Sequence, residues 1–228
     1  MIAKGKSRIC GALCVAFVMA LGTPQLAGAT ESPYDTPDVR AFFTEYGVDA
    51  DTQDALIASM ESGSMIDALK AGEEPVSSTT QIRDGFEETV LKYADGSVGV
   101  TALEIPQPAP TTDLSARTIS GCTVYSGAGW ASSSNCKVSH SAAYATLSFY
   151  ANYQQTASGG SISNLRDEDI SATFGSVSNK SLTLIRANST SSQPAVATLH
   201  GYWSSGSLAE DLYLSLRVNA GGGWTTTY

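Results

Sequence analysis

The stretch that decides the fold is residues 144–156, Tyr-Ala-Thr-Leu-Ser-Phe-Tyr-Ala-Asn-Tyr-Gln-Gln-Thr. Apolar and polar residues alternate along it, which is the pattern of a β-strand that buries one face. The same alternation returns at residues 211–219, where the apolar positions are Leu212, Leu214, Leu216 and Val218. Further strands are predicted at residues 136–141, 170–175, 181–187 and 195–203. Residues 117–228 are therefore predicted to be a mainly β domain, an antiparallel β-sandwich of immunoglobulin-like or jelly-roll-like kind.

Small residues mark one face of the strand predicted at 195–203. Ala195, Ala197 and Gly201 alternate there with the larger residues Val196, Thr198, His200 and Tyr202. Small residues on the inward face predict that the two sheets approach closely.

The N-terminal segment 1–29 has the composition of a secretory signal peptide. Basic residues precede the apolar run from Ile9 to Leu21, and Ala27-Gly28-Ala29 follows as a small-x-small cleavage pattern. We predict cleavage after Ala29 and a secreted, extracellular protein. Cys14 lies inside the apolar run, which argues against a lipid anchor. No later stretch has the roughly 20 apolar residues of a membrane span.

Charge divides the rest of the chain into two regions. Residues 30–113 hold 17 acidic and 4 basic residues, whereas residues 114–228 hold 5 acidic and 6 basic residues. After signal removal the net charge is −12, which excludes nucleic acid as a natural partner.

The acidic region 30–105 is predicted to be a small α+β arm. Thr36 and Pro37 provide a helix start, Gly47 a stop, and Asp49 or Asp51 can cap a second helix. Asp84-Gly85 and Asp95-Gly96 are hairpin dipeptides between strands expected from Thr79 to Ile105. The arm is either a propeptide or docking module, or a structural unit with a solvated acidic surface.

Alternating prolines at positions 106, 108 and 110 predict an extended linker over residues 106–116. This linker would separate the arm from the β domain.

Two cysteines, Cys122 and Cys136, remain after signal removal. In an exported protein such a pair is most simply a disulfide. The alternative is a reactive thiol assisted by His140.

The sequence assigns no catalytic residue. His200 with Asp211 or Asp169 could complete a Ser-His-Asp set, but no G-x-S-x-G or H-E-x-x-H motif is present. A sheet-surface position is the simpler prediction for His200.

One acidic cluster lies in the nearly neutral β region. Its oxygen-bearing residues Asn164, Asp167 and Asp169 are candidate calcium ligands, because Ca²⁺ prefers clustered oxygens. The alternative is a hydrated turn, and no other cofactor is predicted.

Aromatic residues on the polar phase of their strands are the candidate binding residues. Tyr150, Tyr202 and Tyr213 are expected to share an outward face and to stack on sugar rings or anchor a protein. The alternative is that this phase faces a second layer or the acidic arm.

The chain also resembles a group of small exported actinobacterial proteins. The resemblance covers most of residues 36–228. It rests on Phe42-Phe-Thr-Glu-Tyr-Gly-Val-Asp49, Glu74-Pro-Val-Ser77, Tyr93-Ala-Asp-Gly-Ser-Val98, and Gly121-Cys-Thr-Val124 with a second cysteine. It implies a bacterial, secreted setting and transfers no activity.

These observations predict a secreted, non-enzymatic module that binds a cell-wall or extracellular carbohydrate or protein surface. The alternatives are a secreted hydrolase with an acidic propeptide and an exported toxin or inhibitor. The patterns at Asn179 and Asn188 match glycosylation sites, but they matter only in a eukaryotic secretory route.

Overall fold

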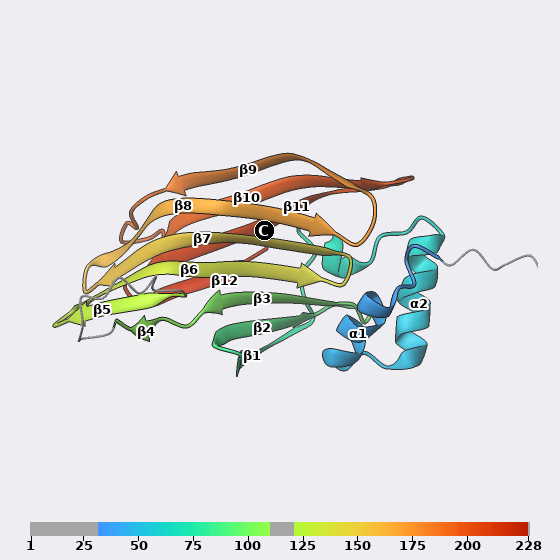
Figure 1. Cartoon of the computed structure of the whole chain (residues 1–228), viewed down its shortest axis with the longest axis horizontal. Coiled ribbons are helices and arrows are strands. Elements are labelled where there is room, and N and C mark those ends of the chain that lie inside the picture. The colour runs from blue at the N-terminus through green and yellow to red at the C-terminus, as the bar shows by residue number, and fades with distance from the viewer. Residues whose placement is uncertain (1–31, 110–120, 228) are drawn as a thin grey trace, which may run out of the picture. The chain divides into compact units, whose positions relative to one another are not determined.

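The computed structural model describes residues 32–109 and 121–227. The protein is mainly β, with two packed sheets of eight and four strands and short helices in the N-terminal region (Figure 1). The predicted β-sandwich is thus confirmed. The predicted signal peptide, its cleavage site and the linker residues 110–116 lie outside the described residues.

The larger sheet is built around the long strand β6 (Trp130–Ala142). One edge of β6 pairs with β7 (Ala145–Thr156), which pairs in turn with β8 (Gly159–Ala172). The other edge has two neighbours in succession, β3 (Val98–Glu104) and β5 (Thr123–Gly127).

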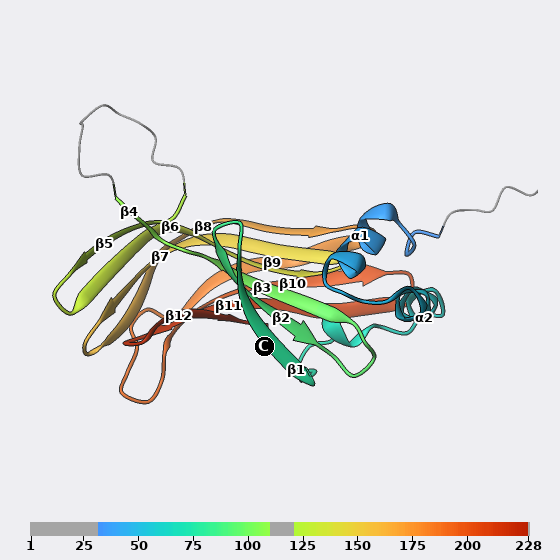
Figure 2. The ribbon, with the colours of Figure 1, turned by 90° about the horizontal axis from the view of Figure 1, so that it is seen from below.

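The remaining strands of this sheet lie beyond those two neighbours. β2 (Phe86–Lys92) and β1 (Ser77–Arg83) continue outward from β3 (Figure 2). The two-residue strand β4 (Gln107–Pro108) pairs in parallel with β5, and all other pairs are antiparallel.

The smaller sheet has the strand order β12-β11-β10-β9. Its strands are β9 (Ser176–Arg186), β10 (Ala195–Ser205), β11 (Leu208–Asn219) and β12 (Gly222–Thr226). The alternating residues predicted to be buried form the core shared by the two sheets. Leu147 and Phe149 of β7 in the larger sheet, and Leu214 and Leu216 of β11 in the smaller sheet, are all fully buried.

The sheets approach closely at Gly201, as the small residues of β10 predicted. A Cβ placed on Gly201 would lie 2.4 Å from Cδ1 of Ile170 in β8. Ala195 and Ala197 of the same strand are fully buried.

The predicted helix starts are also observed. Helix α1 (Pro37–Glu45) begins after Thr36, whose side chain accepts a hydrogen bond from the Val39 amide. Helix α2 (Ala50–Glu61) is capped by Asp49, and the short 3₁₀ turn η1 (Asp67–Leu69) follows. Neither helix in this part of the chain combines the length and apolar content needed to cross a bilayer.

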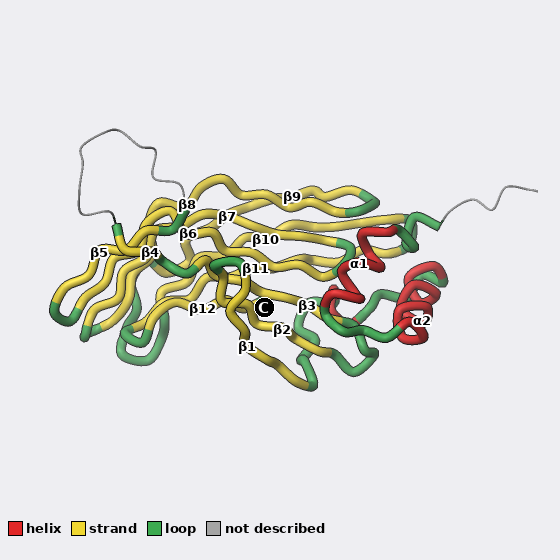
Figure 3. Tube along the Cα trace, turned by 60° about the horizontal axis from the view of Figure 1, so that its bottom comes forward, coloured by secondary structure: helices red, strands yellow, loops and turns green. Residues whose placement is uncertain are grey.

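The helices close one end of the sandwich (Figure 3). An aromatic series runs from Phe43 of α1 through Tyr144 and Phe174 to Trp203 of β10, with ring-centroid distances of 6.4, 5.4 and 5.6 Å. Phe43, Tyr144 and Trp203 are fully buried. Short amphipathic helices need such a partner surface, because they are marginally stable alone.

The structure differs from the predicted division into arm, linker and β domain. The described residues, 32–109 and 121–227, belong to one compact unit. Strand β3, expected in the arm, pairs with β6 from Val100↔Ser141 to Leu103↔Val138. Gln107 and Pro108, expected in the linker, form β4. Hydrophobic patterning shows which segments are strands, but it does not identify their partners.

Candidate functional site

The three tyrosines predicted to share a face lie on different sheets. Tyr150 lies on the outer face of β7 in the larger sheet, whereas Tyr202 and Tyr213 lie on the outer face of the smaller sheet. Because the inner faces pack together, the outer faces point apart. The prediction that the three tyrosines share one outward face is therefore wrong. Alternation along a strand shows on which side of its own sheet a side chain lies, but it does not show which sheet the strand joins.

Tyr150 lines an open groove of about 740 Å³ on the outer face of the larger sheet, beside the disulfide. We name it the disulfide groove. Its lining residues come mostly from β6, β7, β8 and the segment before β5: Phe86, Glu104, Gly121, Ser134, Asn135, Lys137, Tyr150, Asn152, Asn164, Arg166 and Asp167.

A row of three side chains crosses this groove. Strand register places Lys137 of β6 opposite Tyr150 of β7, and Tyr150 opposite Arg166 of β8. The Arg166 guanidinium carbon lies 5.5 Å from the centre of the Tyr150 ring, within cation–π range. The ring therefore has a cationic residue on each neighbouring strand.

Backbone irregularities concentrate around this row. Three of the six non-glycine residues with positive φ in the described chain line the groove: Asn135 (φ 61°), Asn164 (φ 51°) and Asp167 (φ 52°). The β6–β7 pairing shifts register between Ser133 and Cys136, and the β7–β8 pairing shifts on both sides of Tyr150. Bulges redirect side chains, and strained backbone of this kind is concentrated at functional sites.

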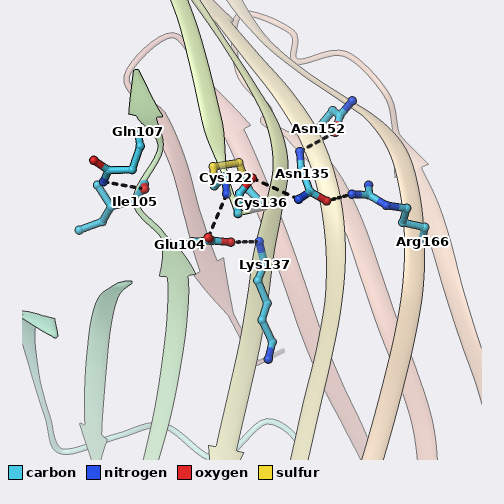
Figure 4. Close-up of a disulfide and its surroundings, with 10 residues drawn as sticks. Glu104, Ile105, Gln107, Cys122, Asn135, Cys136, Lys137, Asn152 and Arg166 are labelled. Atoms are coloured by element: carbon cyan, nitrogen blue, oxygen red, sulfur yellow. Dashed lines mark hydrogen bonds between the residues drawn. A yellow bond between two sulfur atoms is a disulfide. The ribbon is translucent and has the colours of Figure 1, made fainter. Parts of the chain in front are cut away.

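Asn135 links the groove strands (Figure 4). Its backbone N–H donates to Oδ1 of Asn152 at 2.9 Å, and its side-chain amide donates to the Gly121 carbonyl at 3.1 Å. Its Oδ1 accepts a hydrogen bond from the Arg166 guanidinium. These contacts hold Arg166 and Asn152 before any ligand arrives.

Glu104 supports the groove where β6 changes neighbours from β3 to β5. Oε1 accepts from the Cys122 amide at 2.9 Å, and Oε2 accepts from the Lys137 amide at 3.0 Å (Figure 4). The predicted disulfide joins Cys122 to Cys136 beside this carboxylate, and both cysteines are buried. This pairing excludes the alternative of a reactive thiol at either cysteine in the oxidised protein.

The smaller sheet carries a separate group of outward side chains. Nε2 of His200 lies 2.7 Å from Oδ1 of Asp211, and the His200 ring lies 4.8 Å from the Tyr213 ring. Tyr202 is paired with Asp211 in the β10–β11 register. Among the described residues no hydrogen bond joins a serine hydroxyl to His200, although Ser181 of β9 lies opposite it in the strand register.

His140 is buried, and Nδ1 lies 3.2 Å from the Val100 carbonyl oxygen. Burial lowers the pKa of His140 from 6.5 to about 4. The neutral ring can donate Nδ1–H to that carbonyl. This position gives His140 a structural role.

The candidate calcium residues do not converge. Asn164 and Asp167 line the disulfide groove, but Asp169 pairs with Ser148 farther along β8. The cationic Nε of Arg166 lies 3.4 Å from a carboxylate oxygen of Asp167. Within the described ranges, no group of three or more His, Cys, Asp or Glu residues can hold a metal ion. Calcium binding stays a prediction from the sequence alone.

No protein-family model, curated protein or solved structure matches the chain. The functional inference therefore depends on the geometry of the groove. Sequence reasoning singled out Tyr150 but not Lys137, Asn135 or Asn152, because bulged strand register brings these four together.

Proposed function

We propose that the protein is a secreted, non-enzymatic binding module and that its disulfide groove holds a saccharide. The observation that carries the proposal is a groove lined mostly by polar residues, several of which are held in place by hydrogen bonds beside the ring of Tyr150. Sugar sites commonly combine an aromatic face, which covers the C–H face of a pyranose, with amide and charged groups that bond its hydroxyls.

The groove has unused hydrogen-bonding groups as well as a stacking surface. The Tyr150 hydroxyl, the Asn152 side-chain NH₂ and the Asn164 side-chain amide have no hydrogen-bond partner within the described residues. Their neighbours are held by the Asn135 contacts, so binding would order few additional side chains. Preorganisation of this kind lowers the entropic cost of association.

The alternative of a hydrolase with a removable acidic propeptide has less support. Removal of the chain before residue 110 would take away β3, which pairs with β6, and Glu104, which bonds two amides of the remaining part. It would also remove Phe43 from the closed end of the core. A protein surface, the other partner class predicted from the sequence, is favoured less because most of the residues that line the groove are polar or charged.

Calorimetric titration of the purified protein with soluble oligosaccharides tests the proposal. Tyr150→Ala should weaken binding roughly tenfold, the size expected for loss of one aromatic contact. Tyr213→Ala is the matched control, because it removes an outward tyrosine from the other sheet. Loss of binding in the control alone would move the site to the smaller sheet, and absence of saccharide binding by the native protein would reject the proposal.

A further inference from the structure

The charged groups of the disulfide groove differ in what they offer a ligand. Glu104 already accepts two backbone N–H groups, and Asp167 lies beside Arg166. Lys137, in contrast, has no salt-bridge partner among the described residues, although it lines the groove. Of the two cationic residues that line the groove, Arg166 lies beside a carboxylate, and Lys137 is the one whose ammonium group can pair with a ligand.

Hydrogen-bond donors outnumber acceptors in the same place. Lys137 supplies three N–H donors, and the unpartnered NH₂ of Asn152 supplies two more. The side-chain amide of Asn164 adds two N–H donors and one acceptor oxygen, the Tyr150 hydroxyl can donate or accept, and the Asp167 carboxylate is an acceptor beside Arg166. A ligand that satisfies these donors must carry hydrogen-bond acceptors, and one anionic group on it would form an ion pair with the ammonium group of Lys137.

Most lining residues of the groove, all except Phe86 and Glu104, come from the nearly neutral part of the chain. The strong negative charge belongs to residues 30–113, whereas residues 114–228 carry 6 basic and 5 acidic residues. The row Lys137–Tyr150–Arg166 lies in this second part, with its two cationic residues on the strands beside β7.

We infer that the saccharide bound in the disulfide groove carries an anionic group, a carboxylate or a sulfate, and that Lys137 binds it while Tyr150 stacks on the sugar ring. This inference rests on the proposed function. In this inference Lys137 determines the preference for an anionic sugar. Tyr150 contributes equally to the binding of charged and neutral sugars. Arg166 acts as a positioning residue, since its guanidinium is already bound to Asn135.

The test compares related sugars with and without an anionic group. Affinities of the native protein are measured for trigalacturonate, for its fully methylated ester, and for a sulfated galactotriose. We expect both anionic sugars to bind roughly tenfold more tightly than the ester, the effect of one charge-assisted contact, and the difference to shrink as salt is raised.

Lys137→Gln should remove this preference while the ester still binds as before, because glutamine removes the charge, keeps a polar side chain only one atom shorter, and leaves the backbone N–H that bonds Glu104. Lys180→Gln, on exposed strand β9 of the other sheet, is the matched control and should keep the preference. Equal affinity for acid and ester, or a preference unchanged in Lys137→Gln, would overturn the inference. If the ester binds and needs Tyr150, the proposed function survives that outcome; if none of the three sugars binds, both fail.

Discussion

Glu104 compensates for a break in the larger sheet. A strand that changes neighbours leaves backbone N–H groups without a ladder partner at the change, and a buried unpaired N–H is costly. The two oxygens of Glu104 accept the amides of Cys122 and Lys137 at this point. One side chain thus supports both the sheet and the floor of the groove.

Glu104→Gln should lower the free energy of unfolding by about 1–3 kcal/mol, because a glutamine has one acceptor oxygen and leaves one of the two amides unpaired. Urea denaturation followed by circular dichroism measures the change. Glu87→Gln, at an exposed position of β2, is the control and should have little effect. Equal stability of the two variants would contradict this role of Glu104.

His140 predicts a particular dependence of stability on pH. Its pKa is about 4 in the folded protein and 6.5 as the reference value. Between these values the unfolded chain binds a proton that the folded protein excludes, so stability falls as pH decreases from about 6.5 to about 4, by at most about 3 kcal/mol. His140→Gln should reduce this fall. Identical pH profiles for the native protein and His140→Gln would refute the assignment.

At the scale of elements, β6 organises the larger sheet and β7 places the aromatic ring of the groove. The Cys122–Cys136 disulfide ties the start of β5 to β6 across a sequence separation of 14 residues. In the chain-entropy account, closing a loop of about 15 residues stabilises the folded state by roughly 3 kcal/mol.

Replacement of both Cys122 and Cys136 by alanine should therefore lower the free energy of unfolding by roughly 3 kcal/mol. Denaturant titration of the two proteins gives the difference. Thiol titration of the native protein in denaturant should detect neither Cys122 nor Cys136. Two reactive thiols from this pair would show that the bond is absent.

Sequence patterns predicted some elements better than others for physical reasons. Strands β7 and β11 bury every second residue, so their alternation was visible. Strand β8 begins at Gly159, well before the predicted start at residue 170. The pattern does not reveal its first part, because most of its residues are polar and exposed and because two residues with positive φ, Asn164 and Asp167, interrupt the alternation. The row through Tyr150 was not predictable, since the register shifts that create it depend on tertiary pairing.

At the scale of the whole described chain, the helices and the sandwich share one hydrophobic core. Val39, Phe43 and Met60 of the helices are fully buried and belong to the same cluster as Leu147 and Leu214 of the two sheets. The acidic N-terminal region therefore contributes to the stability of the sandwich, in addition to any further role.

Phe43→Ala should lower the free energy of unfolding by about 3–5 kcal/mol and shift the unfolding of the helices and both sheets together. Phe42→Ala is the matched control, because Phe42 is only partly buried and should cost less. Tryptophan fluorescence, which includes the buried Trp203, is compared with far-ultraviolet circular dichroism. A fluorescence transition unaffected by Phe43→Ala would indicate an independently folding arm.

The central claim, that the disulfide groove is the binding site, is tested most directly by locating a bound sugar on the native protein. Amide chemical shifts in nitrogen-15 NMR spectra are followed as trigalacturonate or its methyl ester is added. We predict that the shifts concentrate at Asn135, Lys137, Tyr150, Asn152 and Arg166 and leave Tyr202 and Tyr213 unchanged. Shifts confined to Tyr202 and Tyr213, or no shifts with either sugar, would contradict the account.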